Sequence, residues 1–165
     1  MRLRTIFLAV LALTLVASAA WAVTATQDIT ISTNIASRAK ITMPTTTVTF
    51  PDSDPDTTPS VSATQNPLTI TCAARTGASS AVTVTVKAAD DLKDGAKSIG
   101  ISNVAWTATG AGYIAGTMSK SADQNVGSWT GSGSRAGTLS FALANSWDYE
   151  TGNYSATATY TLTVP

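Results

Sequence analysis

The chain has 165 residues, with ten basic and ten acidic residues, no histidine and a single cysteine. Without histidine, Ser-His-Asp and Cys-His catalysis are excluded, and the commonest zinc ligand is missing. The balanced charge leaves no basic excess that would attract nucleic acid. Only 12% of the residues are charged, and a composition rich in Thr, Ser, Ala and Gly is typical of many short strands joined by turns.

The first 22 residues have the pattern of a signal peptide. Arg2 and Arg4 form a positive region, Ile6 to Val16 is an apolar core, and Ala20-Trp21-Ala22 is a small-x-small cleavage motif. The apolar run is shorter than a membrane span requires, although an uncleaved anchor is the alternative interpretation. We therefore expect a single mature domain of residues 23–165, secreted, periplasmic or at the cell surface, with no membrane span after cleavage. Losing the two arginines leaves eight basic and ten acidic residues, a net charge of −2.

Strands are predicted wherever apolar and polar residues alternate with a period of two. The first predicted strand contains Ile29 and Ile31, and the second contains Ala39, Ile41 and Met43 and extends through Val48 and Phe50. The next two have apolar faces formed by Leu68, Ile70 and Cys72, and by Val82, Val84, Val86 and Ala88. The last four are residues 99–107, residues 126–130, the segment with Leu139, Phe141 and Leu143, and residues 154–164. Residues 89–97 break the pattern and predict either one helical turn ending at Gly95 or a polar loop. Gly131-Ser132-Gly133-Ser134 predicts a tight turn or a flexible tip.

The last predicted strand has the most regular pattern. From Tyr154 to Val164 the even-numbered residues are apolar or aromatic, including two small alanines at 156 and 158, and the odd-numbered residues are Ser or Thr. Such a strand has one dry face and one exposed face. No segment has a sustained helical period, which argues against a parallel sheet with crossover helices. The sequence therefore predicts an all-β, antiparallel β-sandwich of about 7–9 strands.

One acidic loop is the only candidate metal site. Asp52, Asp54 and Asp56 stand at alternate positions, where three carboxylates can converge on a hard cation such as calcium. Pro55 interrupts them, however, and neither a turn glycine nor a bidentate Glu follows at the needed distance, so a solvated acidic loop is the favoured interpretation. Asp148 and Glu150 fit a glycosidase-like carboxylate pair less well than they fit ordinary loop charges. No cofactor is expected.

Cys72 lies on the apolar face that Leu68 and Ile70 predict. A thiol in that position is expected to be buried and unreactive, because burial raises its pKa. Trp106, Trp129 and Trp147 are expected to pack in the core and at its rim, with a sugar-stacking platform as the alternative.

Several stretches resemble the spore coat protein U-like domains and related bacterial pilin subunits. The opening stretch Ile31–Thr42, the Val48-Thr49-Phe50 segment, the strand Pro67–Cys72 and the terminal strand Tyr154–Pro165 are similar to the corresponding strands of those domains. The resemblance implies an immunoglobulin-like sandwich used as a surface or fibre subunit, and it does not imply an enzyme. Where the family places its first cysteine, this chain has Arg38 or a neighbour, which would leave Cys72 as one half of a lost disulfide.

The sequence thus favours an exported, non-enzymatic structural or cell-surface protein of the pilin or coat-subunit kind. The alternative is a secreted module that binds carbohydrate or calcium through the Asp52 loop or through exposed tryptophans. The expected partners are other copies of the chain or other surface subunits, joined by strand addition. Residues 23–31 have small or apolar side chains at most alternate positions, interrupted by Gln27, and predict either a strand donated to a neighbour or the first strand of the protein's own sheet.

Overall fold

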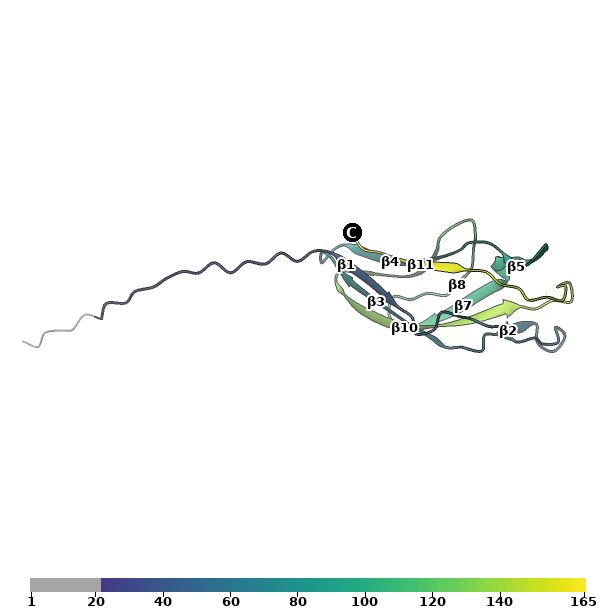
Figure 1. Ribbon diagram of the computed structural model, residues 1–165. Helices are drawn as coiled ribbons and strands as arrows, with labels where there is room; N and C mark the ends of the chain where they lie inside the picture. Colours follow the sequence, from purple (N-terminus) through teal and green to yellow (C-terminus); the bar gives the residue numbers. More distant parts are fainter. Residues whose placement is uncertain (1–21) are drawn as a thin grey trace, which may run out of the picture. The chain divides into compact units, whose positions relative to one another are not determined.

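The computed structural model describes residues 22–165, so the predicted signal peptide lies outside the described residues except for Ala22. Residues Asn34–Pro165 form one compact unit, to which residues 22–33 do not belong. The described residues contain eleven strands and one short 3-10 turn, Ile101–Asn103, and no α-helix. Every strand pair is antiparallel, so the expectation of an all-β, antiparallel protein is confirmed (Figure 1).

The larger sheet is built around one long strand, β10 (Gly133–Ala144). It pairs with β3 (Leu68–Arg75) on one side and with β7 (Val104–Thr109) on the other. The sheet has the order β1–β3–β10–β7–β8, and a further short strand, β2, also pairs with β10. The short members are β1 (Arg38–Thr42), β2 (Ser60–Ser62) and β8 (Gly116–Thr117). Because β1 pairs only with β3, it is an edge strand of this sheet.

The smaller sheet has three strands in the order β11–β4–β9. They are β11 (Ala158–Thr163), β4 (Ala81–Ala88) and β9 (Gln124–Thr130). β9 leads into β10 of the other sheet through Gly131 and Ser132, and Gly131 has φ +79°, a conformation that glycine adopts without strain. The expected turn is thus found at Gly131 and Ser132 only, since Gly133 and Ser134 already belong to β10. The polar stretch after β4 forms a hairpin of β5 (Leu92–Asp94) and β6 (Lys97–Ile99).

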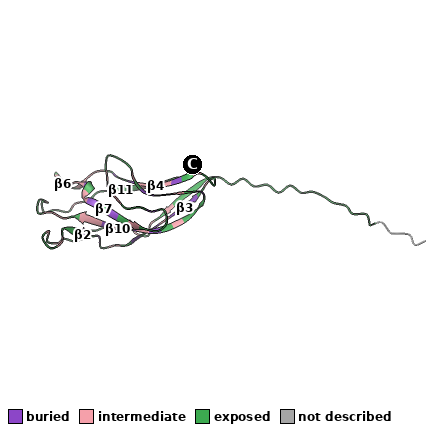
Figure 2. Ribbon diagram, turned by 180° about the vertical axis from the view of Figure 1, so that it is seen from behind, coloured by how far each residue is buried: buried purple, intermediate pink, exposed green. Residues whose placement is uncertain are grey.

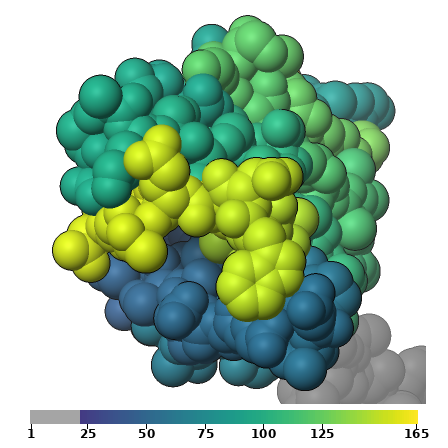
Figure 3. Space-filling view, turned by 90° about the vertical axis from the view of Figure 1, so that its right-hand side faces the viewer, coloured from purple at the N-terminus to yellow at the C-terminus, as the bar shows by residue number. Residues whose placement is uncertain are grey.

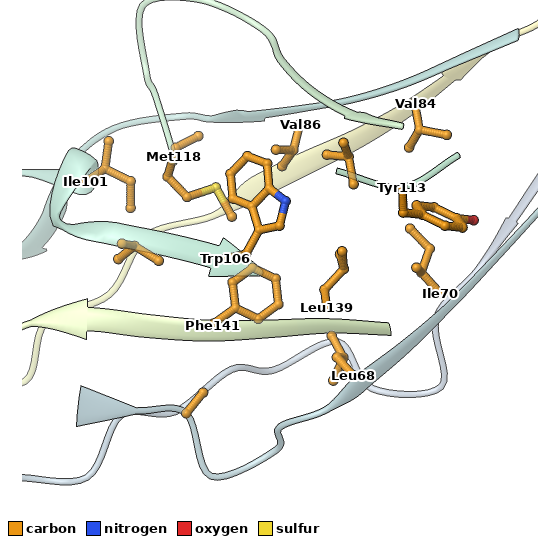
Figure 4. Packing of buried hydrophobic residues seen from close by; sticks show 14 of the residues in the cluster. Leu68, Ile70, Val84, Val86, Ile101, Trp106, Tyr113, Met118, Leu139 and Phe141 are labelled. Carbon is orange, nitrogen blue, oxygen red and sulfur yellow. The ribbon is translucent and has the colours of Figure 1, made fainter. Parts of the chain in front are cut away.

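Both larger sheets contribute side chains to one hydrophobic core. Every second residue of β3 and β4 is buried, as the alternation in the sequence predicts. Figure 4 shows how aromatic and aliphatic side chains from the two sheets meet, and the buried stretches of β3, β4 and β7 stand out in Figure 2. The largest members of this core are Leu68, Ile70, Val84, Val86, Ile101, Trp106, Tyr113, Met118, Leu139 and Phe141.

Two aromatic side chains of the core donate hydrogen bonds to backbone carbonyls. The indole N–H of Trp106 donates to the carbonyl of Ile114 at 2.9 Å, and the Tyr113 hydroxyl donates to the carbonyl of Arg135 at 3.0 Å. The Tyr113 ring lies against Gly137 so closely that a Cβ there would be 2.5 Å from a ring carbon. A side chain at position 137 would therefore push the tyrosine away from its partner.

The strands give the compact unit two distinct ends. At one end lie Arg75, the Gly131-Ser132 turn and Pro165, whose carbonyl accepts hydrogen bonds from the hydroxyls of Ser37 at 3.1 Å and Thr76 at 2.8 Å. We call this the turn end. At the other end, which we call the loop end, β10 finishes, β11 begins, and the loops 51–59 and 145–157 are joined by a hydrogen bond from Asn145 to Ser53. Figure 1 shows the two ends on opposite sides of the compact unit.

The structure departs from the expected elements in several places. Residues 89–97, expected as one helical turn or a polar loop, contain most of the β5–β6 hairpin, and the strand expected at 99–107 is interrupted by the 3-10 turn Ile101–Asn103. The strand predicted at 29–32 is wrong, because residues 22–37 form no strand and have no ladder partner. Residues 43–50 also form no strand, since Pro44 lacks the backbone donor that a ladder requires. The last strand is shorter than predicted: β11 spans Ala158–Thr163, and the residues before it are tied to β5 by the Lys93–Ser155 bridge.

Candidate functional site

An apolar groove opens between the segment 43–50 and the residues leading into β11. Its volume is about 290 Å³. One wall consists of Met43, Val48 and Phe50, and the other of Ala156, Ala158 and Tyr160. The floor is formed by members of the core, namely Leu68, Ile101, Val104, Met118 and Phe141. The groove therefore lies directly over buried residues of the hydrophobic core, beside the edge of the smaller sheet.

The last strand borders this groove with an unpaired edge. β11 pairs only with β4, so within residues 22–165 the backbone groups on its other side have no strand partner. Tyr160 and Leu162 are only partly buried, and Ala156 and Ala158 are exposed although they line the groove. One additional strand could use the free N–H and C=O groups and cover these side chains at the same time.

The groove is closed at the turn end and open at the loop end. At the turn end β1 and β11 lie beside each other, and Ser37 is hydrogen-bonded to Pro165. At the loop end the walls continue into the loops that follow Phe50 and precede Ala156. Figure 3 faces this end and shows a hollow between the yellow residues of the last loop and the blue residues below them. A segment that entered the groove would have to come from the loop end.

Residues 23–33, which we call the N-terminal arm, carry large apolar side chains that no other described residue covers. The exposed fractions are 94% for Val23, 81% for Ile29 and 93% for Ile31. These residues and Ala25 share one side of an extended chain, and Thr24, Thr26, Asp28, Thr30 and Ser32 share the other. Leaving three large apolar side chains in water forgoes about 1.5–3 kcal/mol for each, relative to burial.

One polar atom in the groove wall is left without a partner. The Tyr160 hydroxyl is buried and makes no hydrogen bond among the described residues. Burial raises the pKa of this phenol well above that of an exposed tyrosine. A buried hydroxyl without a partner is costly, so a segment that supplied an acceptor or donor here would gain an additional interaction.

The acidic loop lies at the loop end, with its carboxylates exposed and used locally. The Asp54 carboxylate accepts a hydrogen bond from the backbone N–H of Asp56 at 2.9 Å, which is an Asx turn. The Asp56 carboxylate accepts one from the indole N–H of Trp147 at 3.0 Å. Within residues 22–165, no group of three acidic, cysteine or histidine side chains is placed to hold a metal ion. Calcium binding by Asp52, Asp54 and Asp56 therefore stays a hypothesis for experiment.

The remaining candidate residues occupy different surroundings. Asp148 and Glu150 lie in the exposed loop 145–157, where Asp148 accepts a hydrogen bond from Ser146 and Glu150 is 4.0 Å from Lys97. Trp106 is buried in the core, whereas Trp147 is 69% exposed. Trp129 of β9 is partly buried and packs against the core. The expectation of core and rim packing thus holds for Trp106 and Trp129 and is wrong for Trp147, which lies in a loop with only its indole N–H engaged.

Cys72 lies in β3 and is fully buried. Burial raises the pKa of its thiol above that of an exposed cysteine. The neighbouring Tyr113 hydroxyl has a smaller effect, which lowers the pKa. The expected placement on the apolar face is confirmed, and the thiol is held in its neutral form.

Charged side chains are distributed unevenly between the two ends. Arg38 of β1 lies directly opposite Arg75 of β3, and Lys40 lies two residues further along the same face. All three are exposed, and a shallow depression of about 510 Å³ lies among them. Single-sequence reasoning missed this cluster, because the two arginines are 37 positions apart and only the strand register brings them together.

Comparison with known proteins does not assign the chain to a family. No protein-family model matches the chain, and no curated protein matches it. In the part of the chain that the structure describes, no helix has the length and apolar character of a membrane span.

Proposed function

We propose that this protein is an exported, non-enzymatic structural subunit of the pilin or coat-subunit kind, which assembles at the cell surface by strand addition. The two larger sheets form an immunoglobulin-like sandwich that lacks one edge strand. The N-terminal arm of one copy completes the sandwich of the next. The observation that carries the proposal is the open groove beside β11, found in the same chain as an exposed arm with apolar residues at alternate positions.

The groove and the arm match in chemistry and in direction. The groove is apolar, and an unpaired strand edge runs along it, which suits a segment that supplies backbone groups and alternate apolar side chains. Because the groove opens at the loop end, an arm that enters there with its N-terminus leading runs antiparallel to β11. Antiparallel pairing is also what the rest of the smaller sheet uses.

The proposal is tested with three proteins: residues 23–165, residues 34–165, and a synthetic peptide of residues 23–33. We expect the longer chain to form concentration-dependent oligomers in size-exclusion chromatography. We expect the shorter chain to be a monomer whose melting temperature rises when the peptide is added. The matched variants are Ile31→Asp, on the apolar side of the arm, and Thr30→Asp, on its polar side. Ile31→Asp should abolish oligomers and peptide binding, and Thr30→Asp should retain both. A stable, monodisperse monomer of residues 23–165 would overturn the proposal.

The second candidate function is carbohydrate binding at the loop end. The exposed Trp147 favours it, because its indole N–H is anchored to Asp56 while the ring remains accessible for stacking on a sugar face. The test is a titration of residues 34–165 with a panel of soluble oligosaccharides, read by tryptophan fluorescence and by calorimetry. Binding that Trp147→Ala abolishes supports this function, and no binding across the panel counts against it.

A further inference from the structure

The turn end carries three exposed cations that make no ion pair with any other described residue. Arg38 and Arg75 are direct cross-strand partners, and Lys40 is diagonal to Arg75 on the same exposed face. Side chains directly opposite in an antiparallel pair have Cβ atoms about 4.5–5.5 Å apart, where like charges destabilise the sheet. No ion pair within residues 22–165 involves any of the three. We call Arg38, Lys40 and Arg75 the basic cluster.

The loop end has the opposite character. None of the six strands β1, β3, β4, β9, β10 and β11 contains an acidic residue, so every Asp and Glu of the compact unit lies in a connection or in the β5–β6 hairpin. Three of the lysines at this end form ion pairs with nearby carboxylates. Lys93 and Lys120 pair with Asp90, and Lys120 also pairs with Asp91. Lys97 pairs with Glu150. The hydrogen bond from Lys120 is the main cause of the lowered pKa of Asp91.

The carboxylates of the loops 51–59 and 145–157 are left mostly uncompensated. Among the described residues, Asp52, Asp54, Asp56 and Asp148 make no ion pair, and all four are exposed. We call these four residues the acidic rim, since they stand at the end where the groove opens. The compact unit therefore presents three unpaired cations on neighbouring strands at the turn end and four unpaired carboxylates at the loop end, where Lys87 is also without an ion pair.

We propose that the basic cluster of one subunit docks on the acidic rim of the next. This inference rests on the proposed strand donation and adds a second, electrostatic contact between successive subunits. Only residues 34–37 connect the arm to β1, and four residues span at most about 14 Å. An arm seated in a neighbour's groove holds its own turn end against the loop end of that neighbour. The contact brings opposite charges together and relieves the repulsion between Arg38 and Arg75.

The contact acts on the rate and direction of assembly more than on final stability. Charges at the rim of an interface steer the encounter and disfavour wrong partners, here two turn ends or two loop ends. The apolar arm supplies the affinity, and the charged ends make head-to-tail the favoured orientation.

One substitution separates assembly from folding. Arg38→Glu puts a glutamate opposite Arg75, which replaces a like-charge pair by an opposite-charge pair. We expect Arg38→Glu in residues 23–165 to raise the melting temperature of the subunit and to slow oligomer growth about tenfold. The matched control is Lys87→Glu, which makes the same charge change on β4, at a site paired with Thr159 near the loop end. That control should not slow growth.

A charge swap tests the partner directly. Arg38→Glu/Arg75→Glu and Asp52→Lys/Asp54→Lys subunits should each grow slowly alone, and mixing them should restore growth, because each supplies the end that the other has lost. Raising the ionic strength from about 0.01 M to about 1 M shortens the Debye length from about 30 Å to about 3 Å and should slow the unaltered protein. Failure of the mixture to recover overturns the inference.

The outcomes distinguish the two proposals. If the unaltered protein forms oligomers and Arg38→Glu grows at the same rate, strand donation stands and the charged contact is wrong. If the unaltered protein forms no oligomers and the arm peptide does not bind residues 34–165, both are wrong. If the basic cluster instead binds an anionic polymer, the slow growth of Arg38→Glu appears only when such a polymer is present. Assembly of purified protein without added polymer excludes that source, and a defect seen only with polymer overturns the subunit contact.

Discussion

The side chain of Asn66 binds both backbone groups of Phe141. Its amide nitrogen donates to the Phe141 carbonyl at 2.7 Å, and its amide oxygen accepts from the Phe141 N–H at 2.8 Å. The Phe141 carbonyl also accepts from the backbone N–H of Ala63 at 3.0 Å, so Asn66 continues the β10 ladder between the residues that pair with β2 and those that pair with β3. Asn66 thus completes the ladder at one of the residues that forms the floor of the groove.

Asn66→Asp tests this relationship. The carboxylate can still accept from the Phe141 N–H, but it cannot donate to the carbonyl and would face that oxygen with a negative charge. We expect a loss of about 1–3 kcal/mol in the free energy of unfolding at neutral pH, measured by urea denaturation of residues 34–165. Lowering the pH until the aspartate is protonated should recover part of the loss. Equal stability of the variant and the parent across pH would contradict the bidentate role.

Tyr160→Phe and Tyr113→Phe form a matched pair with opposite expectations. The Tyr160 hydroxyl is buried without a partner, so removing it should leave the free energy of unfolding unchanged or raise it by up to about 1 kcal/mol. The Tyr113 hydroxyl donates to Arg135, so removing it should cost about 1 kcal/mol. Thermal melts of residues 34–165 at pH 7 give the comparison. A loss in Tyr160→Phe as large as that in Tyr113→Phe would mean that the Tyr160 hydroxyl is engaged.

The same tyrosines predict how stability depends on alkaline pH. Burial raises the pKa of Tyr160 and of Tyr113 above the value of about 10 for an exposed phenol. Above that pH the unfolded chain releases these protons while the native chain retains them, so the free energy of unfolding falls as the pH rises. Tyr160→Phe should reduce the slope of this decline between about pH 10 and pH 11. An unchanged slope would show that Tyr160 ionises at the same pH in the folded and unfolded chain.

Much of the fold could be predicted from local pattern. The alternation in β3 and β4 identified their buried residues, because one face of each strand packs in the core. The pattern failed at Ile29 and Ile31, where it describes a segment suited to a strand that finds no partner in its own unit. An alternating pattern indicates that a segment can form a β-strand. It does not indicate whether the strand that pairs with it belongs to the same chain or to another.

The candidate site could not be predicted from the sequence. The groove depends on Val48 and Tyr160 lying on facing walls, although 112 residues separate them. The basic cluster likewise depends on the register that sets Arg38 against Arg75. Neither arrangement follows from spacing along the chain, because shifting a register by one residue exchanges the two faces of a strand.

Cys72 should react with a thiol reagent only when the protein unfolds. Its side chain is fully buried in β3, and burial raises the pKa of the thiol, so little thiolate exists to react at neutral pH. We expect the native protein to remain unlabelled over hours and the denatured protein to be labelled within minutes. Ser134→Cys in a Cys72→Ala background places a thiol on the exposed face of β10 and should label at once. Rapid labelling of native Cys72 would show that β3 opens locally.

Replacing the three loop aspartates with asparagine should have little effect on folding. Asp54 and Asp56 use their side-chain oxygens to accept hydrogen bonds from a backbone N–H and from the Trp147 indole, and asparagine retains such an oxygen. We therefore expect Asp52→Asn/Asp54→Asn/Asp56→Asn to change the free energy of unfolding of residues 34–165 by less than about 0.5 kcal/mol in chelator. A ligand that binds only the native state raises the melting temperature in proportion to its occupancy. Adding millimolar calcium should leave the melting temperatures of the parent and the variant unchanged. A rise in the parent that the variant lacks would instead establish a calcium site in the loop 51–59, with Trp147 fluorescence as an independent measure of its occupancy.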